Sequence, residues 1–214
     1  MLALTALLLC GPIPTLAQQS TGQPMSRWQV NLDVAGVLLH PSATVDIAGM
    51  GVPGASASTS DAVTGTIDLS YYLTPNIAID LYSGIPPEMT VKGTGSIGSV
   101  GTVATTRYGA GVLSVEYHFT GLGRFEPYVG AGVNYTVFFA THGSTLSGAD
   151  ISNGWGAALK VGLRYALDHS WGLHIYVQQL FVNTRLSGQL GPLPVSAKAT
   201  LNPTIVGAGL SYRF

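Results

Sequence analysis

The stretch of sequence that decides the fold is RFEPYVGAGVNYTVFF, residues 124–139. Its side chains fall into two sets at a period of two, which is the repeat of a β-strand. One set is Val129, Ala131, Val133, Tyr135, Val137 and Phe139, and the other is Tyr128, Gly130, Gly132, Asn134, Thr136 and Phe138. The first set suits lipid and the second suits a polar or crowded interior. The stretch therefore predicts a strand with one face in a membrane.

The final stretch, residues 203–214 (PTIVGAGLSYRF), alternates in the same way and closes on Phe214. An alternating strand that ends on an aromatic residue is typical of bacterial outer-membrane barrels, whose walls carry apolar outward faces and aromatic girdles. We therefore expect both stretches to be staves of one barrel.

The composition agrees with a membrane barrel. Of the 214 residues, 46% are apolar and only 9% are charged, against roughly 25% charged in an ordinary soluble domain. A membrane helix needs about 20 successive apolar residues, and no such run exists outside the N-terminus. The formal net charge is -1 and no basic stripe is present, which excludes nucleic acid as a partner.

The N-terminus predicts a secretory signal over residues 1–17, with a cleavage site at Thr15-Leu16-Ala17. Residues 18–25 are expected to be a periplasmic segment, and residues 26–214 the barrel. Cys10 suggests lipid attachment as an alternative, but Leu9 stands where a small residue is wanted. Removal of Cys10 leaves a mature chain without a thiol, and hence without disulfides.

The alternation predicts an all-β fold, an eight-stranded antiparallel transmembrane β-barrel with up-and-down topology. Short turns and long loops alternate along the chain. This alternation places the long loops outside the cell and both termini in the periplasm. The expected strands are residues 26–39, 62–73, 77–83, 106–119, 124–139, 154–167, 171–184 and 203–214, and the expected long loops are 40–61, 84–105, 140–153 and 185–202.

Three segments together resemble the OmpW family of small outer-membrane barrels. They are FEPYVGAGVNYTVFF at 125–139, the pair Trp155-Gly156 opening a strand that ends in GLRYAL at 162–167, and the closing residues 203–214. The resemblance implies a passive, non-enzymatic barrel whose lumen takes small hydrophobic molecules from outside and releases them sideways into the outer membrane. The expected partners are outer-membrane lipid and a small hydrophobic ligand or detergent. Cargo, exit site and oligomeric state do not carry over.

The inward positions of the strands include charges of both signs, which we expect to pair as a polar plug in the lumen. The set is Arg27, Asp33, Asp68, Asp80, Glu116, Lys160, Arg164 and Arg213. Arg27, Glu116, Arg164 and Arg213 are expected near the periplasmic end, and the other four near mid-height. Singly, each is more often a structural ion pair than a functional group.

The inward positions of the extracellular half are apolar, which predicts a funnel open to the outside above the plug. This set is Val37, Tyr82, Tyr108, Val112, Phe138, Leu180, Val182 and Ile205. The alternative hypotheses are a surface module whose loops bind a host, phage or other partner, and a structural barrel whose lumen is packed throughout.

Other motifs carry little chemistry. Residues 93–98 (GTGSIG) match the dinucleotide-binding pattern but lack a helical period after them. The five His show no zinc spacing, so we expect neither a metal nor a cofactor. His142, Ser144 and Asp150 share one loop and could form a hydrolytic set, but nothing in the sequence orients them.

Overall fold

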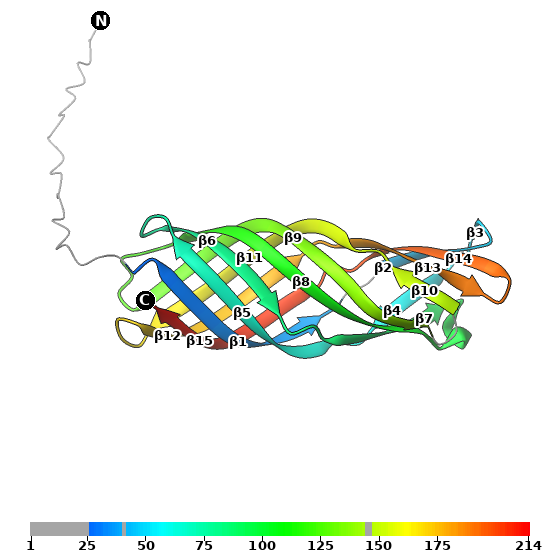
Figure 1. Ribbon diagram of the computed structural model, residues 1–214, viewed down its shortest axis with the longest axis horizontal. Coiled ribbons are helices and arrows are strands. Elements are labelled where there is room, and N and C mark those ends of the chain that lie inside the picture. The colour runs from blue at the N-terminus through cyan, green and yellow to red at the C-terminus, as the bar shows by residue number, and fades with distance from the viewer. Residues whose placement is uncertain (1–25, 40–41, 144–146) are drawn as a thin grey trace, which may run out of the picture.

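The computed structural model describes residues 26–39, 42–143 and 147–214 (Figure 1). The predicted signal and periplasmic segment lie outside these residues. The strands are β1 (Trp28–Leu38), β2 (Ser42–Ile47), β3 (Met50–Gly51), β4 (Ala55–Thr59), β5 (Ala62–Tyr72), β6 (Ile77–Gly84), β7 (Glu88–Gly95), β8 (Thr102–His118), β9 (Phe125–Gly143), β10 (Ser147–Ile151), β11 (Gly154–Ala166), β12 (Trp171–Leu180), β13 (Asn183–Leu190), β14 (Leu193–Thr200) and β15 (Thr204–Arg213), with one 3-10 turn, η1 (Gly98–Val100). None of the helical residues in these ranges forms a span of the length and hydropathy that would cross a bilayer.

Eight of the strands close into a barrel. Their order is β8-β6-β5-β1-β15-β12-β11-β9, and β9 pairs with β8 to complete the ring. Every pairing around the ring is antiparallel. Closure satisfies the backbone groups of each strand within the wall, as a membrane requires. The predicted eight-stranded antiparallel barrel is confirmed.

The two faces of each strand differ in burial as the alternation predicts. On β9, Asn134 is fully buried whereas its neighbour Tyr135 is 37% exposed. On β8, Leu113 and Val115 are more than half exposed, whereas Val112 and Ser114, which alternate with them, are buried. Large apolar side chains thus cover the outside of the barrel, where lipid tails would solvate them.

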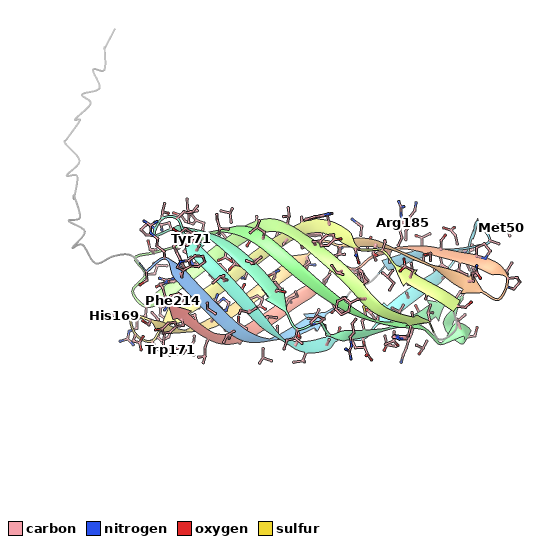
Figure 2. The ribbon with its side chains drawn as sticks, viewed as in Figure 1. Met50, Tyr71, His169, Trp171, Arg185 and Phe214 are labelled. Carbon is pink, nitrogen blue, oxygen red and sulfur yellow. The ribbon has the colours of Figure 1, made fainter. Side chains whose placement is uncertain are left out.

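Aromatic pairs mark one end of the barrel, which carries Phe214 and the three short turns and which we name the turn end. Trp28 lies 4.7 Å from Tyr71 between ring centroids, and Trp171 lies 4.8 Å from Tyr212. Figure 2 shows Tyr71, Trp171 and Phe214 gathered there. At the opposite border of the apolar wall, Tyr135 and Trp155 lie 4.7 Å apart. Two such girdles bound the part of a barrel that sits in a membrane.

The prediction of four long loops is wrong for most of their length. These segments form β2, β3, β4, β7, β10, β13 and β14, and β8 and β9 run on to meet them. β7 and β4 join the sheet of β8, and the others form a second sheet in the order β10-β13-β14-β2-β3. We call this part the extension, on the right in Figure 1. The small residues of the extension obscure the alternation in the sequence. Pairing between neighbouring hairpins is nevertheless sufficient for strands to form.

The turn between β11 and β12 depends on one carboxylate. Asp168 Oδ1 accepts hydrogen bonds from the backbone N–H of Trp171 (2.7 Å) and of Ser170 (2.8 Å). These bonds hold the pKa of Asp168 below its usual value, since they favour the charged form. A depressed folded-state pKa contributes stability that is present above the unfolded value of about 3.9 and is lost as the pH falls through the folded value.

We expect the amide signals of Ser170 and Trp171 to titrate together, with a midpoint below about 3.9. Two-dimensional NMR of the barrel in micelles over an acid pH series measures this midpoint. Asp168→Asn should keep the turn, because its amide oxygen still accepts, and should abolish the titration. A midpoint at or above that of a free aspartate would contradict this account.

Candidate functional site

The interior of the barrel is polar towards the turn end. Arg164 Nη1 donates to Glu126 Oε1 (3.1 Å) and Arg213 Nη2 donates to Glu126 Oε2 (2.8 Å). Arg213 also donates to Gln29 Oε1 (2.7 Å) and to the hydroxyl of Tyr72 (2.6 Å). A single carboxylate from β9 therefore bridges arginines from β11 and β15.

The next layer is organised around Lys160, which is 6% exposed. Its ammonium pairs with Asp68 Oδ1, with Asp80 Oδ2 at 3.2 Å and with Glu116 Oε1 at 3.3 Å. The rings of Tyr176, Tyr82 and Tyr128 surround the same ammonium, with centroids 5.2 to 5.7 Å away. One buried lysine thus contacts carboxylates from β5, β6 and β8.

Two histidines extend this polar network by contacting carboxylates of the lumen. His118 Nε2 lies 3.2 Å from Glu116 Oε2, and His174 Nδ1 lies 2.9 Å from Asp33 Oδ1. The hydroxyl of Tyr128 lies 2.7 Å from His174 Nε2 and its ring stacks on both histidines, at 4.9 Å from His118 and 5.9 Å from His174. The ring stack and these polar contacts together link residues of β1, β8, β9 and β12 across the lumen.

One group of side chains has the composition of a metal site. Ligand atoms of Asp33, Asp68 and His174 lie within 4.8 Å of one another, and all three residues are buried. They come from β1, β5 and β12, so no spacing in the sequence could reveal them. Asp33 already pairs with His174, and Asp68 already pairs with Lys160. Each of the three side chains therefore has a polar partner within the lumen network.

The structure places most of the predicted plug residues together and differs at Arg27. Asp33, Asp68, Asp80, Glu116, Lys160, Arg164 and Arg213 all lie in the lumen. Arg27 is exposed at the turn end, where its guanidinium donates to the hydroxyl of Tyr71 (3.2 Å). Arg27 precedes β1: its carbonyl still accepts a hydrogen bond from the Tyr72 N–H (2.7 Å), but its side chain lies at the exposed edge of the barrel. Glu116 lies with Lys160, deeper than expected.

Sequence reasoning missed Glu126, the carboxylate that holds both arginines. Its signal was present, because Glu126 shares the parity of the inward Tyr128 on the same strand. It precedes Pro127 near the start of β9, where we assigned no inward face. Counting it gives buried Arg164 and partly buried Arg213 an anionic partner.

Above the plug the interior is apolar. The eight residues of the predicted funnel are all buried and belong to one apolar cluster with Met89 and Leu201. All but Val112 line a cavity of about 50 Å³ inside the barrel. The rings of Tyr108 and Phe138 lie 6.3 Å apart in its wall.

A second cavity of about 100 Å³ lies in the extension. Its lining is apolar and includes Val45, Val91, Ile97, Val103, Leu186 and Val195. Met89 and Leu201 line both cavities. The sequence did not predict the outer cavity, because most of its lining comes from segments expected to be loops.

The barrel wall is interrupted beside the inner cavity. The ladder between β6 and β8 ends at Tyr82 opposite Val112, and the ladder between β7 and β8 begins at Glu88 opposite Arg107. Pro86 and Pro87 fall in this gap and cannot donate backbone hydrogen bonds.

The wall is thin at the end of β6, next to β5. Gly84 and Ile85 line the inner cavity and also a groove on the outer, lipid-facing surface. Ile85 is 70% exposed. A single layer of side chains therefore separates the cavity from the membrane side.

A closed antiparallel barrel with an apolar exterior, two aromatic girdles and polar residues in its interior defines a bacterial outer-membrane β-barrel protein. The chain matches the OmpW family model over residues 27–214 and belongs to the OmpW family. Members of this family are typically non-enzymatic membrane proteins. Ser144 of the imagined hydrolytic set lies outside the described residues.

The chain is similar to several known relatives over most of its length. It is 36% identical to outer membrane protein AlkL of Ectopseudomonas oleovorans over 92% of this chain and 86% of AlkL, and the AlkL structure in lipid bilayers superposes with a TM-score of 0.72, covering 92% of this chain and 93% of that one. It is 32% identical to the dibenzothiophene metabolism operon protein PahQ of Pseudomonas aeruginosa over 97% of this chain and 95% of PahQ. The crystal structure of OprG from Pseudomonas aeruginosa has a TM-score of 0.83 at 21% identity, covering 88% of this chain and 96% of OprG, and this likeness concerns the fold.

Proposed function

We propose that this protein is a passive outer-membrane conduit for small hydrophobic molecules. The observation that carries the proposal is the pair of apolar cavities that share Met89 and Leu201 above a charged plug. Apolar solutes gain free energy on leaving water for such a lining, at about 25 cal/mol per Å² of buried apolar surface. A relative named for a dibenzothiophene metabolism operon is consistent with hydrophobic cargo.

The direction of passage follows from the plug. The extension faces outside and the turn end faces the periplasm, as in bacterial barrels with short periplasmic turns. A solute that has entered through the extension meets Lys160 and its three carboxylates below the inner cavity. Breaking such buried pairs is costly, so the axial route to the periplasm is closed and the solute must leave through the wall.

The exit is placed at the end of β6, where the outer groove over β1, β5 and β6 reaches the inner cavity. There Gly84 and Ile85 stand between the inner cavity and the outer groove, and the proline pair leaves the ladder incomplete. Movement of the Ile85 side chain alone would join the cavity to the acyl chains. The solute would then partition into the membrane without crossing an aqueous space.

Uptake of a hydrophobic dye or a linear alkane by cells with and without the protein tests the proposal. Cells carrying the protein should take up the probe faster, and planar-bilayer recordings of the purified barrel should show no large ion conductance, since the plug is intact. Equal uptake in both cell types would favour a surface-recognition or purely structural barrel. A wide, weakly selective, water-filled pore would overturn the proposed route.

The exit predicts a position-specific block. Ala110 lines the inner cavity at the gap, so Ala110→Trp should fill the inner mouth of the exit and slow uptake of the same probe by about tenfold or more. The matched control is Gly111→Trp, because Gly111 is exposed and an added Cβ there meets nothing within 4 Å. Equal uptake by the two variants, both folded, would place the exit elsewhere.

A further inference from the structure

A groove on the outside of the extension carries two positive charges. It is lined by Thr44, Ser152, Asn183, Thr184, Arg185, Lys198, Ala199 and Thr200, from β2, β13, β14 and the segment before β11. Arg185 and Lys198 are both exposed. Figure 2 shows Arg185 projecting away from the wall. The groove is separate from the apolar cavities, although Thr184 and Ala199 also contact the outer one.

The two cations stand opposite each other without an anion between them. Arg185 on β13 pairs in register with Lys198 on β14, an arrangement that is unfavourable for like charges. Within the described residues neither makes an ion pair. The nearest acids by register are Asp150, opposite Ser187, and Asp46, opposite Ser196. Both acids lie two residues closer to the tip of the extension than the cations do. An anion that approaches from the membrane side would therefore meet the cations before the acids.

The height of the groove relative to the apolar wall identifies the kind of anion. Outward residues of β12 are apolar or aromatic from Trp171, in the girdle at the turn end, to Phe181 just after the strand, with Gln179 the exception. Ten residues of a strand tilted by about 40° advance about 25 Å along the barrel axis, which is the height of the apolar band of a barrel. Arg185 follows four residues later, about 10 Å further along the axis. That is the level of the lipid headgroups.

We propose that this groove binds the phosphate groups of a phosphorylated lipid headgroup, namely lipid A of the outer leaflet. Arginine matches two phosphate oxygens with its planar fork, and lysine adds a second charge. Thr44 and Asn183 contribute neutral polar groups at the rim of the groove. Basic pockets at the membrane surface recognise lipid headgroups in this way. Bound phosphate would remove the repulsion between Arg185 and Lys198 and anchor the β13–β14 hairpin to the bilayer surface.

The test measures binding of lipid A to the full-length barrel in detergent micelles, by microscale thermophoresis. The probes are lipid A with both phosphates and the same lipid A after both phosphates have been removed. We expect about tenfold weaker binding of the dephosphorylated lipid. The double variant Arg185→Gln/Lys198→Gln should bind the phosphorylated lipid more weakly by a similar factor. It should bind the phosphorylated and dephosphorylated lipids with the same affinity.

The matched control is Lys92→Gln/Arg107→Gln, which removes two exposed cations from β7 and β8 on another part of the extension. It should bind within about twofold of the natural chain. Equal losses in both double variants would reduce the effect to overall charge and overturn the proposal, as would equal binding of both lipids. Displacement of lipid A by inorganic phosphate at the same concentration would assign the groove to a free anion instead.

This site shares the outward orientation of the extension with the proposed conduit, and nothing else. The Arg185→Gln/Lys198→Gln variant changes no residue that lines a cavity, although sequence neighbours of both positions do line the outer one. It should therefore take up hydrophobic probe at the natural rate. Loss of lipid A binding with normal uptake supports the site, and loss of uptake together with lipid binding would overturn its independence from the conduit.

Discussion

Phe138→Asp is expected to reduce uptake of a hydrophobic dye at least tenfold while the barrel remains folded. Phe138 is 8% exposed and lines the inner cavity beside Tyr108. An isolated carboxylate in an apolar site costs several kcal/mol unless water enters with it. Either response removes the dry lining that a hydrophobic solute needs. The measurement is the initial rate of probe uptake, normalised to the amount of folded protein.

Two further variants separate lost hydrophobicity from lost shape. Phe138→Leu keeps an apolar surface and should retain most of the uptake, whereas Tyr108→Asp places a charge on the neighbouring strand in the wall of the same cavity and should reproduce the loss. Ser187→Asp adds the same charge on the exposed face of β13 and should leave the rate unchanged. Normal uptake by a folded Phe138→Asp protein would show that the solute does not pass through this cavity.

Lys160→Met is expected to destabilise the barrel more than any substitution on its outer wall. The change removes the cation from Asp68, Asp80 and Glu116, all of which are buried. Removing one partner of a buried ion pair costs about 3–5 kcal/mol, because the remaining charge has neither water nor a counterion. The free energy of unfolding, from urea titrations of the barrel in lipid vesicles, measures the loss.

Compensating changes distinguish unpaired charge from lost packing. Lys160→Met combined with Asp68→Asn and Asp80→Asn should recover much of the loss, since two uncompensated carboxylates disappear. Arg107→Gln is the comparison for an ordinary ion pair: its partner Glu88 lies 3.8 Å away, and both side chains are more than half exposed. That variant should lose less than about 1 kcal/mol. A Lys160→Met barrel as stable as the natural one would mean that the three carboxylates are neutral in the folded protein.

The two-residue repeat of residues such as Asn134 and Tyr135 was enough to determine the barrel and the face to which each stave residue belongs. A period of two fixes the side of the wall, because successive side chains of a strand point in opposite directions. The buried position of the predicted funnel residues follows from this rule. So does the inward orientation of Glu126, which the rule would have found had it been applied before Pro127. Arg27 was misplaced because it lies at the edge of the barrel before β1, where its long side chain reaches outward to Tyr71.

The tertiary structure alone decided which inward groups meet. Lys160 finds its carboxylates on β5, β6 and β8, with Asp68 separated from it by 92 residues along the chain. Alternation states that these side chains share the lumen, but their heights depend on the registers of strands around the whole ring. The extension was decided in the same way, since β13, β14 and β2 are strands because they pair with one another. The alternation in the sequence therefore specified a barrel with an apolar outer surface and a polar interior. Only the closed ring set the plug, the two cavities and the thin part of the wall, because these depend on contacts between strands that are distant in the chain.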